Sequence, residues 1–304
     1  MDRSLRTVKR LFMLAALVFV AGAAPNSILL REQAWTTGAD ARAFLEEPAE
    51  CLASRDLRVE TGRALFRSPA LLGGPAARAG LSCNACHSGG RRNARFLLPE
   101  LTDRAGAADV TSEWASRTRG DGVANPVEIP DLNGVTHRDA FGGVRDPSLE
   151  HFVHGVMVEE FQGQEPSAEV MASVLAYLRA LDEGECTRGA APISLASTAD
   201  DVRRALAAAE QSDAPTARLL LLAAQDAVGR IVERLPARKF SRDRARFERL
   251  SRDLGALRRD DVHEAVSAAA PAWRARFNAA VARVARKERR TYFNEATLQA
   301  ALER

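Results

Sequence analysis

The sequence predicts an all-α protein made of two helical parts joined by a short linker. Alanine, arginine and leucine dominate the composition, whereas aromatic residues make up only 6%, and alanine and arginine are good helix formers. Apolar residues recur at helical spacing over residues 170–181, 220–235, 240–257 and 273–284. The last three stretches follow one another with short connections, which favours an antiparallel helical bundle at the C-terminal end.

Residues 1–24 have the organisation of a secretory signal peptide. Four basic residues precede an apolar run over residues 11–20, and small residues at 21–24 suit an A-x-A cleavage site. The apolar run is too short to span a bilayer comfortably, and there is no twin-arginine pair. We therefore expect Sec-type export, a periplasmic mature protein and no stable membrane span after cleavage.

The charge of the chain excludes some classes of partner. The 304 residues carry a formal net charge of +3, a small excess among many charges of both signs. Such a balance predicts neither a nucleic acid nor an acidic membrane as partner.

The most specific motif is Cys83-Asn84-Ala85-Cys86-His87. Two thiols separated by two residues can each add to a vinyl group of one porphyrin, and the next histidine is then held under the iron as its proximal ligand. A zinc site would need a second ligand pair at similar spacing, and a redox dithiol would need a βαβ context; the sequence shows neither. The motif predicts one covalent haem c, anchored by Cys83 and Cys86 and ligated by His87.

A haem domain is expected over residues 49–187. It opens with a helix over 58–68, in which Gly62 marks the close approach of another helix. Residues 88–166 are rich in Gly, Pro, Asp and Asn, and so long an irregular segment is unusual unless something else supplies the core. A buried porphyrin would do so. Helical periodicity returns over 167–181, with Ser167 as the expected N-cap.

These residues resemble a c-type cytochrome domain. Gly62-Arg63-Ala64-Leu65-Phe66 is similar to the N-terminal helix of that family, and Ala176-Tyr177-Leu178-Arg179-Ala180-Leu181 to the C-terminal helix that crosses it. Pro99 and Leu101 are similar to the Pro-x-Leu that follows the haem histidine in small cytochromes. The resemblance implies that the Pro99 carbonyl accepts the ring N–H of His87 and so orients it.

A second stretch is similar to one half of the di-haem cytochrome c peroxidase group. It comprises Pro130-Asp131-Leu132-Asn133-Gly134-Val135, Phe141-Gly142-Gly143 and Ser148-Leu149-Glu150. That group carries two haem motifs, whereas this chain has one and contains no cysteine after residue 190. A complete di-haem enzyme is therefore excluded within one chain.

The sixth position on the iron decides between electron transfer and catalysis. Met157 follows the motif and precedes the last helix of the haem domain, an order that resembles the methionine ligand of small cytochromes, and thioether ligation would give a carrier. If no side chain binds there, the iron is open to peroxide, and Glu159 and Glu160 become candidates for acid–base work. The rival ligands are three histidines: His137, His151 and His154.

Three arginines follow the motif closely, and guanidinium forks suit the anionic propionates of a haem. We expect one of Arg91, Arg92 and Arg95 to pair with a propionate, with Arg91 and Arg95 as the first candidates; Trp114 is a further possible donor. The remaining cysteines, Cys51 and Cys186, bracket the haem domain and are expected to form a disulfide in an oxidising compartment.

A linker over 188–197 leads to the bundle, residues 198–304, whose role the sequence does not define. Its arginine-rich stretch over 242–259 is expected to be a solvated face, with an acidic redox partner as the alternative. The expected function is one-electron transfer to redox partner proteins in the periplasm. The alternatives are a peroxidase-like haem enzyme and a haem sensor or adaptor that docks a partner through the bundle.

Overall fold

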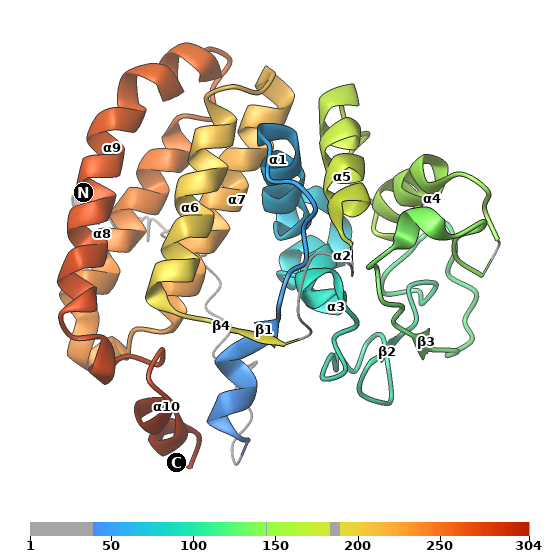
Figure 1. The fold of residues 1–304 in the computed structure, drawn as a ribbon, viewed down its shortest axis with the longest axis horizontal. Helices are drawn as coiled ribbons and strands as arrows, with labels where there is room; N and C mark the ends of the chain where they lie inside the picture. The colour runs from blue at the N-terminus through green and yellow to red at the C-terminus, as the bar shows by residue number, and fades with distance from the viewer. Residues whose placement is uncertain (1–38, 144, 183–188, 304) are drawn as a thin grey trace, which may run out of the picture.

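The computed structural model describes residues 39–143, 145–182 and 189–303, and helices dominate its secondary structure (Figure 1). The all-α class is confirmed at this level. The expected signal peptide lies outside the described residues. Among the helices that are described, none combines the length and the apolar character that crossing a membrane requires.

Two crossing helices organise the N-terminal part. Helix α1 (Leu57–Phe66) packs against helix α5 (Ala168–Ala180), which begins after Ser167 as predicted. At the crossing, a Cβ atom on Gly62 would lie 1.9 Å from the carbonyl oxygen of Ser173. The close approach predicted for Gly62 is therefore confirmed, because a side chain there would collide with backbone.

Short elements and irregular chain connect α1 to α5. The short elements are helix α2 (Gly74–Arg78), helix α3 (Cys83–Cys86), strands β2 (Ala107–Ala108) and β3 (Val127–Glu128), helix α4 (Leu149–Gly155) and a π-helical turn (Val156–Glu160). The two strands pair antiparallel. The Gly- and Pro-rich composition thus predicted the irregular character of this segment correctly.

The C-terminal part consists of longer helices that lie side by side (Figure 1). They are α6 (Leu195–Ala209), α7 (Ala214–Glu233), α8 (Ala237–Ala256), α9 (Val262–Ala285) and the shorter α10 (Glu295–Leu302). The apolar spacing over 273–284, with Pro271 just before it, predicts a helix that starts at the proline. Helix α9 corrects this prediction, since it begins at Val262 and Pro271 lies inside it. The fully buried Val262 and Val266 continue its apolar face on the N-terminal side of the proline, and this burial offsets the hydrogen bond that proline cannot make.

The expected linker over 188–197 is partly regular structure. Strand β4 (Ala190–Pro192) pairs antiparallel with strand β1 (Glu46–Pro48), and α6 begins at Leu195. A single hydrophobic core continues from Val59 in α1 to Phe247 in α8. The two parts expected from the sequence therefore share one core.

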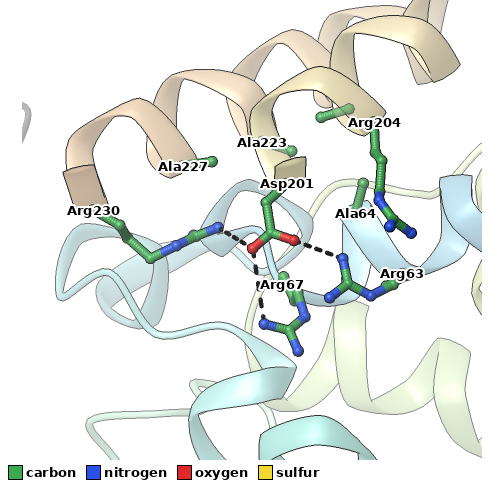
Figure 2. Close-up of a pocket in the computed structure, with 9 residues that line it drawn as sticks. Arg63, Ala64, Arg67, Asp201, Arg204, Ala223, Ala227 and Arg230 are labelled. Atoms are coloured by element: carbon green, nitrogen blue, oxygen red, sulfur yellow. Dashed lines mark hydrogen bonds and ion pairs between the residues drawn. The ribbon is translucent and has the colours of Figure 1, made fainter. Parts of the chain in front are cut away.

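A buried cluster of charges joins the same two parts (Figure 2). Asp201 of α6 lies 2.7 Å from Arg63 and 3.9 Å from Arg67, both at the end of α1, and 3.3 Å from Arg230 of α7. Burial alone would raise the pKa of Asp201, but the three guanidinium groups outweigh it and lower the pKa to about 2. The carboxylate is charged at neutral pH and links three helices.

Candidate haem-attachment site

The Cys-x-x-Cys-His motif occupies the single helical turn α3 and the residue that ends it. His87 leaves the helix with φ −114° and ψ 62°, while its backbone N–H donates to the Cys83 carbonyl. Gly89 and Gly90 follow with φ of 58° and 77°, a conformation that favours glycine. A Cβ atom on Gly89 would lie 2.4 Å from the carbonyl oxygen of Pro48. The glycine pair thus lets the motif pack directly against strand β1.

The ring of His87 is held in one tautomer. Its Nδ1 lies 3.0 Å from the carbonyl oxygen of Pro130. A carbonyl can only accept a hydrogen bond, so Nδ1 carries the proton and Nε2 keeps a lone pair. Burial lowers the pKa of His87 to about 4, and the opposing effects of Pro130 and Asp131 are smaller. The imidazole is therefore neutral at physiological pH, the form that binds iron.

The predicted role of Pro99 is wrong, because Pro130 supplies the carbonyl that His87 faces. Pro99 lies in a turn in which the preceding Leu98 carbonyl accepts hydrogen bonds from the chain that follows. The segment containing Pro130 reaches the motif because the backbone N–H of Leu132 donates to the Gly90 carbonyl at 2.9 Å. Residues 130–132 read Pro-x-Leu just as residues 99–101 do. The sequence therefore offers two copies of this pattern, and the prediction used Pro99 because it lies nearer to His87 in the sequence.

The two thiols of the motif are free and half-buried. Burial raises the pKa of both Cys83 and Cys86 to about 12, so both are protonated at neutral pH. In the part of the chain that the structure describes, no three His, Cys, Asp or Glu side chains are grouped to hold a metal ion. The motif supplies two thiols that can form thioethers and one imidazole that can bind iron, so its donor set fits a haem.

A small apolar cluster borders the motif. Its buried members include Leu81, Phe96 and Phe161, and the half-buried Cys86 and Trp114 pack against it. A porphyrin is apolar over most of its surface, so this wall suits it. Trp114 contributes as a packing residue here.

Met157 is the buried one among the candidates for the sixth position, with 2% of its surface exposed. It lies in the π-helical turn Val156–Glu160, a rare geometry that is frequent at functional sites. The hydrophobic core that contains Met157 also contacts Cys83 and Leu132, which flank His87 and its acceptor.

The three histidines lie toward the surface. His137 is exposed. The side chain of His151 is 77% exposed and its Nδ1 contacts the Asp146 carboxylate. His154 places its Nε2 at 2.9 Å from Glu165. These contacts engage two of the three rings with carboxylates.

The three arginines that follow the motif have different partners. Arg91 lies 3.7 Å from Asp131, next to the carbonyl that His87 contacts. Arg92 instead pairs with Glu128 at 3.2 Å, and the Arg95 guanidinium donates to a backbone carbonyl at 2.7 Å. Of these three arginines, Arg91 is therefore the one that contacts the segment whose Pro130 carbonyl faces His87.

Glu159 and Glu160, the two candidates for acid–base catalysis, both form ion pairs with one arginine. Arg119 donates to Glu159 at 2.6 Å and to Glu160 at 3.0 Å. Glu160 is buried, with 6% exposure, and is therefore not a solvated charge. Arg119 lies 40 residues before Glu159, and no local pattern links them.

Cys51 is disulfide-bonded. Its expected partner, Cys186, lies outside the described residues. The backbone carbonyl of Cys51 accepts a hydrogen bond from the N–H of Asp182, which brings the two ends of the expected haem domain, residues 49–187, together.

Comparison of the chain with protein-family models, with curated proteins and with solved structures found no match. The site geometry is therefore what supports a function.

Proposed function

We propose that the protein is an exported, single-haem c-type cytochrome that carries one electron at a time. The observation that carries this proposal is the hydrogen bond from His87 to the Pro130 carbonyl, made beside two free thiols on one helical turn. It leaves Nε2 of a neutral imidazole available next to two groups that can form thioethers. The haem supplies the one-electron chemistry when bound.

Each residue of the proposed site then has a defined role. Cys83 and Cys86 anchor the haem, His87 is the proximal ligand and Pro130 orients it. Met157, buried in its π-helical turn, is the proposed sixth ligand. The finer architecture that we propose is a cytochrome c-like haem domain over 49–187 followed by an antiparallel helical bundle. The partners in this proposal are periplasmic redox proteins.

One observation favours a second candidate, a peroxidase-like haem enzyme with an open sixth site. The carbonyl beside His87 comes from the stretch that is similar to one half of the di-haem peroxidase group. Against this, Arg119 pairs with both Glu159 and Glu160, so both carboxylates already have a cationic partner. The electron carrier therefore remains the better-supported function.

The optical spectrum of the exported, purified protein tests the proposal. Methionine ligation predicts a low-spin oxidised spectrum with a weak near-infrared sulfur-to-iron band. Met157→Ala should abolish that band, whereas Met171→Ala, which removes a methionine buried in α5, should keep it. A high-spin spectrum that changes on adding peroxide would favour the enzyme. A colourless protein with both motif thiols free would overturn the haem assignment.

A further inference from the structure

A groove with a basic rim lies between helices α8 and α9, on the side of the molecule away from α3 and α4 (Figure 1). Its volume is about 270 Å³. The residues that line it are Arg246, Arg249 and Leu250 of α8 and Arg276, Ala279, Ala280 and Arg283 of α9.

The floor of the groove is apolar and firmly held. Leu250 and Ala280 are buried, with exposed fractions of 4% and 6%. Beneath them, the indole N–H of Trp273 donates to the Leu250 carbonyl at 2.9 Å, and the rings of Phe247 and Phe277 meet edge to face at 6.1 Å. These contacts fix the spacing of the two helices independently of the arginines on the rim.

Two of the four rim arginines have carboxylate partners. Arg246 lies 3.0 Å from Asp243, and Arg276 lies 2.8 Å from Asp253. Arg249 and Arg283 have no ion-pair or hydrogen-bond partner for their side chains within the described ranges. Both are exposed, so their guanidinium donors are available to a ligand.

The positive charge of the groove is a local excess. Its four arginines and Lys287, which also reaches Asp243, outnumber the two carboxylates by three. Four basic residues and one aspartate in the expected signal peptide account for the formal net charge of +3, so the rest of the chain is formally neutral. The local excess of positive charge at this groove suits an anionic partner.

We propose that this groove binds an acidic segment of a partner protein. Guanidinium forks match carboxylates in geometry and charge, and the apolar floor accommodates one aliphatic side chain between them. Small-molecule sites are usually larger, about 300–1,000 Å³, and cover most of the ligand, whereas the rim here is exposed. Nucleic acid would need a longer basic track than the four arginines of this groove offer. The inference stands on the groove itself and goes beyond the proposed haem chemistry.

The test uses the full-length mature protein and a fluorescein-labelled peptide of five Glu-Leu repeats, with fluorescence anisotropy as the readout. We expect binding at low salt that weakens as sodium chloride is added. The matched peptide with glutamine in place of glutamate should not bind. Arg249→Gln combined with Arg283→Gln should weaken binding about two- to thirtyfold, because two exposed charge pairs together contribute about 0.4–2 kcal/mol.

Arg252→Gln combined with Arg286→Gln is the control, since it removes the same charge from an exposed position of α8 and from the exposed residue that follows α9, neither of which lines the groove. Unchanged binding by this control supports the proposal. Equal weakening by both pairs of substitutions, no binding at low salt, or tighter binding of a DNA duplex than of the peptide would overturn it. The circular-dichroism spectrum of each variant confirms that it is folded.

Discussion

Replacing Asp201 with asparagine tests whether the cluster in Figure 2 holds α1 against the C-terminal helices. The pKa of this carboxyl falls from an ordinary 3.8 to about 2 in the folded protein, which corresponds to about 2 kcal/mol of stability at neutral pH. The asparagine also leaves Arg63 and Arg67 with one anionic partner fewer, and breaking a buried pair costs about 3–5 kcal/mol. Glu50 still pairs with both arginines. We therefore expect Asp201→Asn to lower the free energy of unfolding by about 2–4 kcal/mol.

Urea unfolding followed by circular dichroism measures this loss, with Asp200→Asn as the control. Asp200 also pairs with an arginine, Arg203, at 2.6 Å, but its side chain is 52% exposed, so its loss should cost less than about 1 kcal/mol. The folded pKa of Asp201 is depressed, so its contribution is complete above pH 3.8 and is lost as the pH falls toward 2. The difference between wild type and Asp201→Asn should shrink over that window. If wild type and Asp201→Asn are equally stable at neutral pH, the reasoning is refuted.

Three further outcomes are expected. Gly62→Ala should destabilise the protein by about 1–3 kcal/mol in the same urea assay, because the methyl group would lie 1.9 Å from the Ser173 carbonyl oxygen. Gly255→Ala is the control and should be neutral or stabilising, because its methyl group meets only a flexible side chain at 3.0 Å. If both cost the same, the tight helix crossing is contradicted. Thiol titration of the denatured, unreduced, haem-free protein should find two thiols, since Cys51 is disulfide-bonded, and four would disprove that bond. In the haem-free protein, NMR should show His87 protonated at Nδ1 alone until the pH approaches about 4, and a charged ring at neutral pH would contradict its burial.

Elements with a local signal were predictable from the sequence. The apolar spacing and the Ser167 cap gave helix α5 within a residue at each end, because both signals lie inside the element. Helix α9 was predicted too short, since its proline suggested a start although the apolar face continues before it. Strand β4 had no local signal at all: three residues of Ala-Ala-Pro become a strand only because β1 lies beside them.

The candidate site divides in the same way. The pentapeptide alone predicts haem attachment, so Cys83, Cys86 and His87 could be proposed without knowledge of the fold. The acceptor for His87 did need one, because two Pro-x-Leu patterns were available and only a long-range contact, from Leu132 to Gly90, selects Pro130. Sequence distance from the histidine favoured the wrong copy.

The shared core also decides how the role of the C-terminal helices can be studied. If those helices formed a separate unit, deleting residues 190–304 would leave the part that contains the Cys-x-x-Cys-His motif intact and reveal what the bundle adds. The structure argues against that experiment, because Arg63 of α1 pairs with Asp201 of α6 and one hydrophobic core runs through both parts. Deletion would expose apolar surface and leave buried arginines without their carboxylate partner. A loss of function would then report unfolding of the remaining chain. Substitutions at exposed positions, such as Arg249 and Arg283 in the groove, avoid this problem because they remove charge without touching the core.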